Sequence, residues 1–309
     1  MVRISRARSA APKRMGLLCA CAVALGMAAQ AQAVTIYAYD NLGTTNAGTV
    51  GDRFFRFDST NPAGTAVNLG QSGVASTLMA GLDFDRSGAL WASSGTRLFS
   101  VNPLNGAATG VGASLGLPAG RTVSDLSFNP VTNQLQAVTI QGAAAPFTTS
   151  LYTINTTTGV ANLVGDIVIS SSSVNVGLAT NSAGVNYVHD LQTDTMFRLA
   201  GLVATALPQP TGVNSNFSQG MTIDWQAGPT GQWFMAPINN TPTFFSEIRT
   251  VNEVTGVATV IVPGGTWPNL PSGFPTYEPG DLAIPTVPEP ASLGLVAAAG
   301  LFAGRRRRH

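Results

Sequence analysis

The chain has 309 residues, of which 44% are hydrophobic and only 10% are charged, with 34 glycines and 19 prolines. This composition differs from that of an ordinary cytosolic domain. Between Val34 and Pro288 there are seven arginines, no lysine and fourteen acidic residues, so this part carries a net charge of −7. Because nucleic-acid binding needs a basic surface, the acidic body argues against DNA or RNA as a partner.

The N-terminus has the three parts of a secretory signal peptide. Five basic residues lie within Met1 to Arg14, an apolar run follows from Met15 to Ala29, and Ala31-Gln32-Ala33 comes next. This order predicts a cleaved leader over residues 1–33, with Ala31 and Ala33 recognised by signal peptidase. The alternative is an uncleaved anchor helix, for which about 15 apolar residues are short.

Both cysteines of the chain, Cys19 and Cys21, lie in this predicted leader. The mature body therefore has no cysteine. Disulfides, thiolate catalysis and cysteine-ligated metals are excluded there, and the body must be stabilised by burial and hydrogen bonding.

The C-terminus carries a second membrane-directed element. Val287-Pro288-Glu289-Pro290 precedes an apolar run from Ala291 to Gly304, and Arg305, Arg306, Arg307 and Arg308 follow. Four arginines after an apolar helix hold its end on the cytoplasmic side. The helix would rise about 21 Å, less than the ~30 Å hydrocarbon core, so it is short for a permanent tail anchor, which is the alternative.

This order of elements resembles the PEP-CTERM sorting signal of Gram-negative bacteria. The resemblance covers Val287 to Arg308 only, and it implies an exported protein that exosortase, a membrane transpeptidase, processes at the inner membrane. It implies transient contact with that membrane and a final place in the cell envelope, at the outer surface or in the extracellular matrix. The sorting signal occupies residues 286–309.

The body, residues 34–285, is built from a repeat. Five segments share a strand pattern that begins with Gly or Asp and carries large apolar residues two positions apart; they are Gly81–Asp85, Asp125–Asn129, Gly177–Asn181, Gly220–Asp224 and Asp281–Pro285. A period of two is the period of a strand. Four further strands end in Asn or Asp, in Phe54–Asp58, Leu98–Asn102, Leu151–Asn155 and Ile248–Asn252, and Thr195–Leu199 is a degenerate form.

The spacing of the first pattern is 44, 52, 43 and 61 residues, and each interval has room for two more strands. Four strands per 40 to 50 residues is typical of a propeller blade. We therefore expect an all-β propeller of about five four-stranded blades, flanked by two short hydrophobic helices. Thr35–Tyr39 lacks a preceding strand and Asp281–Ile284 lacks a following blade, so these two are expected to pair and close the ring. A β-sandwich or an open β-repeat is the alternative. The repeat style resembles that of secreted propeller domains that often carry this C-terminal signal.

Few residues of the body are suited to catalysis or to ligand binding. His189 beside Asp190 is the only histidine of the body, and a lone histidine cannot build a multi-histidine metal site. It is a candidate general base, but Val188-His189-Asp190 is expected to lie where a strand turns. Asp83 and Asp85 begin a segment like half of a calcium loop, although Arg86 and Ser87 follow, and a turn is favoured. Trp267, in an irregular segment, is a candidate for stacking on a sugar. No cofactor is expected, and no residue is assigned a catalytic role.

Two functions remain open. The favoured one is a non-catalytic envelope or matrix protein, associated with exopolysaccharide or biofilm, that binds glycan or a surface protein. The alternative is an extracellular propeller hydrolase or lyase that acts on polysaccharide or a lactone. Such an enzyme needs several acidic or histidine side chains at one end of the strands, with Asp83, Asp85, Asp125, Asp224 and His189 as the scattered candidates.

Overall fold

A computed structural model describes residues 33–40, 52–74, 79–142, 147–169, 174–215, 218–225, 231–239, 245–263 and 279–286. All of them belong to the compact unit Ala33–His309, which is separate from Met1–Gln32. Ala31, Trp267, the sorting signal from Val287 onward and both predicted hydrophobic helices lie outside the described residues. Within those residues, no helix has the length and apolarity that a bilayer crossing requires.

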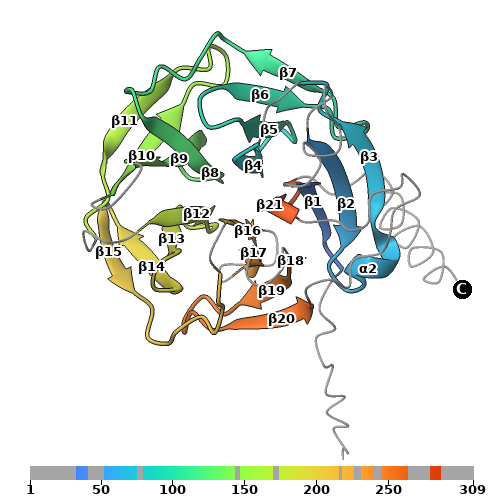
Figure 1. Cartoon of the computed structure of the whole chain (residues 1–309), viewed down its shortest axis with the longest axis vertical. Helices are drawn as coiled ribbons and strands as arrows, with labels where there is room; N and C mark the ends of the chain where they lie inside the picture. The colour runs from blue at the N-terminus through green and yellow to red at the C-terminus, as the bar shows by residue number, and fades with distance from the viewer. Residues whose placement is uncertain are drawn as a thin grey trace, which may run out of the picture. The chain divides into compact units, whose positions relative to one another are not determined.

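The described strands form five antiparallel sheets arranged around a common axis, which we call blades 1 to 5 (Figure 1). Blade 1 contains, from the centre outward, β21 (Pro279–Ala283), β1 (Thr35–Asp40), β2 (Arg53–Asp58) and β3 (Val67–Gln71). Blade 2 contains β4 (Gly81–Phe84), β5 (Leu90–Ser93), β6 (Leu98–Val101) and β7 (Ala108–Val111). Blade 3 contains β8 (Arg121–Asn129), β9 (Gln134–Gln141), β10 (Thr148–Ile154) and β11 (Ala161–Asp166).

The last two blades follow the same plan. Blade 4 contains β12 (Asn175–Thr180), β13 (Asn186–Asp190), β14 (Thr195–Ala200) and β15 (Val203–Ala206). Blade 5 contains β16 (Ser218–Asp224), β17 (Gln232–Asn239), β19 (Ile248–Val251) and β20 (Ala258–Val262), with β18 (Phe245–Ser246) paired to β17. A four-residue helix, α2 (Pro62–Thr65), follows β2 and is capped by Asn61, whose side chain accepts from the Gly64 amide.

Blade 1 is completed by strands from the two ends of the body. β21 pairs with β1 in antiparallel register, with Ala38 opposite Leu282 and Tyr37 opposite Ala283. The expectation of a five-bladed propeller closed between Thr35–Tyr39 and Asp281–Ile284 is thereby confirmed, and the sandwich and open-repeat alternatives are wrong. Closure pairs the strands that would otherwise leave the first and last sheets incomplete.

The core consists of five hydrophobic clusters, each between two neighbouring blades. Because successive side chains of a strand point to opposite faces of its sheet, each blade contributes to the cluster on either side. The apolar column of the sequence repeat is distributed accordingly, one residue to each cluster: Leu82, Leu126, Leu178, Met221 and Leu282. All five side chains are buried.

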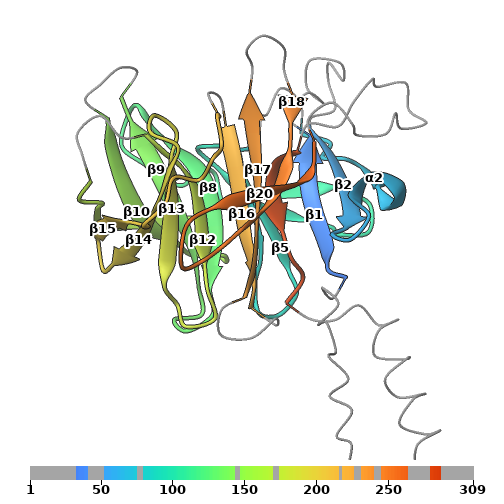
Figure 2. The same ribbon diagram turned by 90° about the horizontal axis from the view of Figure 1, so that it is seen from below.

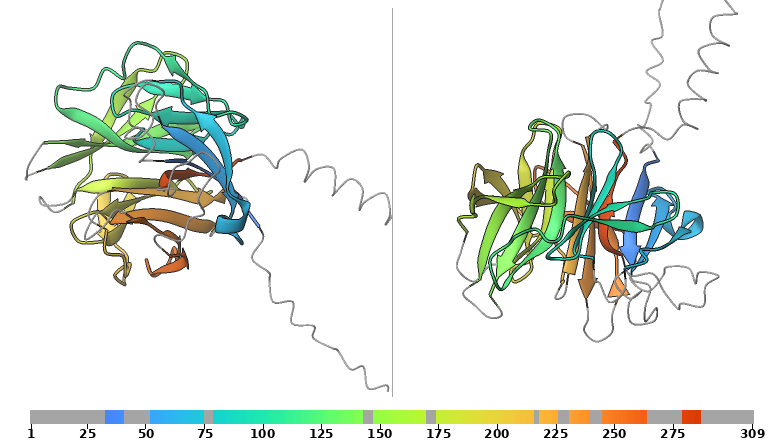
Figure 3. Two further views of the ribbon diagram at one scale, coloured as in Figure 1. Left: turned by 45° about the vertical axis from the view of Figure 1, so that its right-hand side comes forward. Right: turned by 90° about the horizontal axis from the view of Figure 1, so that it is seen from above.

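The strands run between two faces of the propeller (Figures 2 and 3). We call the face at which the chain enters each innermost strand the entry face, and the opposite one the turn face. The turn face carries the turns from the first to the second strand of blades 2 to 5. Since β1 begins where β21 ends, Ala33 and Thr286 both lie at the turn face.

Candidate functional site

The axis of the propeller is lined by the innermost strands β21, β4, β8, β12 and β16. At the first position of the repeat these strands carry two aspartates and three glycines: Asp281, Gly81, Asp125, Gly177 and Gly220. A side chain at Gly220 would collide with its neighbour, since a Cβ there would lie 2.1 Å from the Asp281 Cα. The two carboxyl groups thus occupy a level of the channel at which the other strands have no side chain.

Three carboxyl groups of the innermost strands tie adjacent blades together in the same way. Asp83 accepts the Phe84 amide at 2.8 Å and, from blade 3, the Phe128 amide at 2.6 Å. Asp125 accepts the amides of Leu126 and, from blade 4, Leu178 at 2.7 and 2.6 Å. Asp281 accepts the amides of Leu282 and, from blade 2, Leu82 at 2.7 and 2.5 Å. One oxygen of each carboxyl group therefore serves its own strand, and the other serves the next blade.

Asp125 and Asp281 are also hydrogen-bonded to each other. They belong to blades 3 and 1, which are not neighbours, so this bond crosses the channel. Burial and the adjacent charge of Asp281 raise the pKa of Asp125 well above its usual value, whereas burial raises that of Asp281 to about 7. Because two close carboxylates cannot both ionise cheaply, the pair holds a proton to a higher pH than an isolated carboxyl group would.

Asp83 has a similar environment. Burial raises its pKa to about 8, while hydrogen bonds from the Phe128 and Phe84 amides act in the opposite direction. All three carboxyl groups are at least 94% buried and bonded to backbone amides. In the described part of the chain, no group of three or more His, Cys, Asp or Glu side chains is arranged to hold a metal ion. The arrangement is that of a structural clasp, in which the oxygens face the protein's own peptide groups.

Asp85 lies away from the channel, in the turn between β4 and β5. One carboxylate oxygen accepts from the Ser87 amide, the Ser87 hydroxyl and the Ala89 amide, and the other accepts from the Trp91 indole at 2.9 Å. Both oxygens are thus used by local structure. The geometry agrees with the turn that the sequence favoured over a calcium loop.

His189 is fully buried near the end of β13, opposite Met196 of β14. The expectation that Val188-His189-Asp190 forms a turn is wrong, because β13 continues to Asp190 and the turn begins at Leu191. Asp190 ends the strand by accepting from the Thr193 hydroxyl and amide. The structure brings Asp83 and Asp125 to the channel, while Asp85 lies in a turn of blade 2 and His189 in a buried strand of blade 4.

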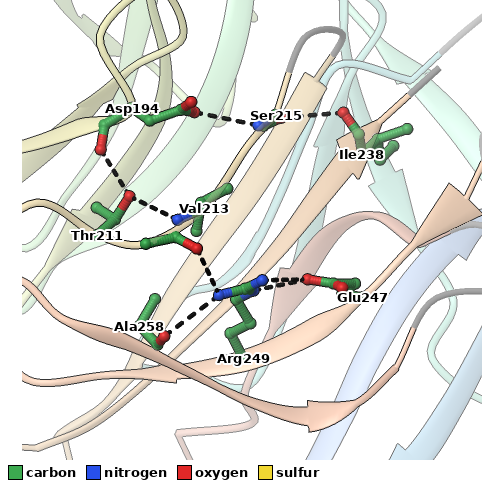
Figure 4. A network of polar contacts seen from close by, with 9 residues as sticks. Asp194, Thr211, Val213, Ser215, Ile238, Glu247, Arg249 and Ala258 are labelled. Carbon is green, nitrogen blue, oxygen red and sulfur yellow. Dashed lines mark hydrogen bonds and ion pairs between the residues drawn. The ribbon is translucent and has the colours of Figure 1, made fainter. Parts of the chain in front are cut away.

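Sequence reasoning missed a polar network that fixes the connection between blades 4 and 5 (Figure 4). Asp194, in a left-handed conformation with φ 49°, accepts the Ser215 amide through its side chain and the Thr211 hydroxyl through its carbonyl. Arg249 donates to the Gly212 carbonyl at 3.1 Å and forms an ion pair with Glu247 at 2.6 Å. These residues hold the connecting segment against both blades, which is a structural role. No repeat pattern marks them in the sequence.

An open cavity of about 530 Å³ lies at the turn face, between blades 2 and 3. Its wall on blade 2 is the β4–β5 turn, and its other walls are the ends of β8 and β10, the start of β9 and the β10–β11 turn. The residues that line it are Asp85, Arg86, Ser87, Phe128, Asn133, Gln134, Leu135, Thr153, Ile154, Asn155, Thr156, Thr157 and Asn162. We call it the seam cavity. Most of its lining is polar, and of the sequence-predicted residues in the described part of the chain only Asp85 borders it.

No protein-family model matches the chain, and no curated protein matches it either. Solved propeller structures do. Regucalcin of Agrobacterium tumefaciens, described as a calcium-binding protein, matches with a TM-score of 0.45 and 12% identity over 73% of this chain and 69% of that one. A candidate 6-phosphogluconolactonase of Bacteroides fragilis matches with a TM-score of 0.43 and 11% identity over 83% and 99%. A luciferin-regenerating enzyme matches with a TM-score of 0.45 and 13% identity over 74% and 72%.

Proposed function

We propose that this chain is an exported, exosortase-processed protein of the envelope or extracellular matrix, and that its propeller binds glycan without catalysing a reaction. The observation that carries the non-catalytic part is the commitment of Asp83, Asp125 and Asp281 to backbone amides. A general acid or base must reach the substrate proton that it transfers. Fully buried groups bonded to the protein's own amides serve the fold instead.

The proposed processing is supported by where the fold is completed. The closing strand β21 ends at Ala283, and the Thr286 hydroxyl donates to the Asp85 carbonyl at 2.6 Å. The predicted sorting signal starts at the next residue, Val287, so its removal would leave the closing sheet and this hydrogen bond in place. Ala33 and Thr286, where the described part of the body begins and ends, lie at the same face of the propeller.

One experiment separates the binding function from the hydrolase or lyase alternative. The exported protein is run in native gels that contain exopolysaccharide purified from the host, and the same polysaccharide is assayed after incubation for new reducing ends and unsaturated products. We expect retarded migration and an unchanged polysaccharide. Release of products by the wild-type protein, lost in Asp125→Asn, would overturn the non-catalytic assignment and favour the alternative; unretarded migration would contradict glycan binding.

A further inference from the structure

The turn face is closed by hydrogen bonds at three of the seams between blades. The Thr286 hydroxyl donates to the Asp85 backbone carbonyl between blades 1 and 2, and the Asn129 side-chain NH2 group donates to the Gly184 carbonyl between blades 3 and 4. Between blades 4 and 5, Glu253 accepts from Asn181 and from the Tyr187 hydroxyl. Side chains thus bridge these seams on the turn face.

The seam between blades 2 and 3 is built differently. Near the channel it is closed by the bond from the Phe128 amide to Asp83, and at its outer edge by the bond from the Ala161 amide to the Leu115 carbonyl at 2.9 Å. The seam cavity opens between these two points. Its volume is within the range of pockets that take small ligands. Ordered backbone on both sides gives it fixed walls.

The side chains around the cavity are rich in hydrogen-bonding groups that the fold does not use. Among the described residues, no side-chain hydrogen bond is made by Asn133, Gln134, Thr153, Thr156 or Asn162. Asn155 uses its carbonyl oxygen for the amides of Thr157 and Thr158, which leaves its NH2 group. Amide and hydroxyl groups in a cleft both donate and accept, which is what the hydroxyl groups of a sugar require.

The charges at the cavity favour the same class of ligand. Both oxygens of Asp85 are used by its own turn and by Trp91. Arg86 is exposed and forms no ion pair within the described part of the chain. Phe128, Leu135 and Ile154 add buried apolar surface to the lining. The cavity thus combines many neutral polar groups, one cation and a small apolar area.

The geometry points to the seam cavity as the glycan-binding site of this protein. The cavity binds a short run of sugar units of a polysaccharide, which contact Asn133, Thr153 and Asn162. This inference rests on the proposed glycan-binding function and adds its location. The sugar's hydroxyl groups pair with the unused amide and hydroxyl side chains. Arg86, which lines the cavity and is exposed, can donate hydrogen bonds to the carboxylate of a uronate unit where the polysaccharide carries one.

The test uses the exported, processed protein and three probes: a glucan, a mannan and a galacturonan oligosaccharide of four to six units each. Binding is followed by calorimetry and by amide shifts in NMR spectra. We expect at least one probe to bind and to shift the amides around Asn133 and Asn162, and we expect Asn133→Ala/Asn162→Ala to weaken its affinity at least tenfold. If the galacturonan binds best, Arg86→Ala will remove that preference.

Thr109→Ala and Thr259→Ala are matched controls. Thr109 faces Ser100 in blade 2, Asn162 faces Thr153 in blade 3 and Thr259 faces Thr250 in blade 5, so the three occupy the same register position. The control variants should bind as the wild type does. Binding that survives the double substitution would overturn the seam cavity but keep the glycan-binding function. Failure of all three probes and of the host exopolysaccharide would overturn both.

Discussion

Aspartate is well suited to the innermost strands because its two oxygens are close to the backbone and point in different directions. In Asp83 one oxygen accepts from the following residue, Phe84, and the other reaches Phe128 in the next blade. The two amides belong to different blades, and each is bonded to its own oxygen. A buried backbone amide without a hydrogen-bond partner costs free energy. Each of these carboxyl groups therefore stabilises the contact between two blades by accepting an amide that apolar packing would leave unpaired.

We predict that Asp83→Ala lowers the free energy of unfolding by about 1–3 kcal/mol, because the buried Phe128 amide loses its acceptor. Asp83→Asn keeps one acceptor and should cost less than the alanine variant. Urea denaturation monitored by tryptophan fluorescence measures both. An Asp83→Ala protein as stable as the wild type would show that Phe128 does not depend on this carboxyl group.

At this scale the fold was only partly predictable from the sequence. The repeat alignment placed Asp125 and Asp281 at its first position and Asp83 two positions after the start of its own segment. It did not reveal that Asp125 and Asp281 bond to each other, because that contact depends on ring closure and on the blade number. The glycan-facing candidates Asn133, Thr153 and Asn162 carry no motif, since ordinary polar residues at strand ends have the same appearance in a sequence.

The innermost strands approach one another closely, and glycine makes this possible. A Cβ at Gly220 would lie 2.1 Å from both the Cα and a carboxylate oxygen of Asp281. The three atoms nearest to a Cβ at Gly177 would all belong to the Met221 side chain, at 3.0 to 3.2 Å. A methionine side chain has three rotatable bonds and can move aside, whereas the Asp281 backbone is held in a sheet.

Gly220→Ala is therefore expected to lower the free energy of unfolding by about 1–3 kcal/mol through overpacking. Gly177→Ala occupies the same position of the repeat and serves as the control, with a smaller loss. Thermal and urea unfolding of the two variants, compared with the wild type, measure the difference. Equal losses of unfolding free energy in the two variants would mean that the close approach of Asp281 is not what excludes a side chain at residue 220.

Strands and turns were the most predictable part of the fold. The alternation of large apolar residues located the innermost strands, and the Asn at the end of a strand pattern located the turns after β6, β10 and β19. The prediction failed at His189 and Asp190, where polar residues suggested a turn but pairing with Met196 and Thr195 extends β13. Tertiary pairing outweighs local turn propensity when the partner strand is in place.

For the propeller as a whole, the raised pKa values predict how stability depends on pH. The pKa of Asp83 is about 8, and those of Asp281 and Asp52 are about 7, each raised from 3.8 mainly by burial. Between about pH 4 and pH 8 the folded protein therefore binds more protons than the unfolded chain. By linkage, the free energy of unfolding falls as pH rises through this interval.

We accordingly predict a higher melting temperature at pH 5 than at pH 8.5. Asp281→Asn removes one of the groups that titrate in this range, so its melting temperature should change less with pH than that of the wild type. Calorimetry of both proteins at matched ionic strength provides the comparison. A melting temperature that rises with pH up to 8.5 would be inconsistent with buried, protonated carboxyl groups in the channel.

The proposed export and processing of the propeller can be measured directly. The intact mass of the chain is determined by mass spectrometry after fractionation of host cells with and without exosortase. We predict a surface or matrix form that lacks both Met1 to Ala33 and the tail from about Val287, and a membrane-bound form that keeps the tail when exosortase is missing. A mature chain from wild-type cells that still ends in Arg305 to Arg308 would contradict the proposed sorting and processing.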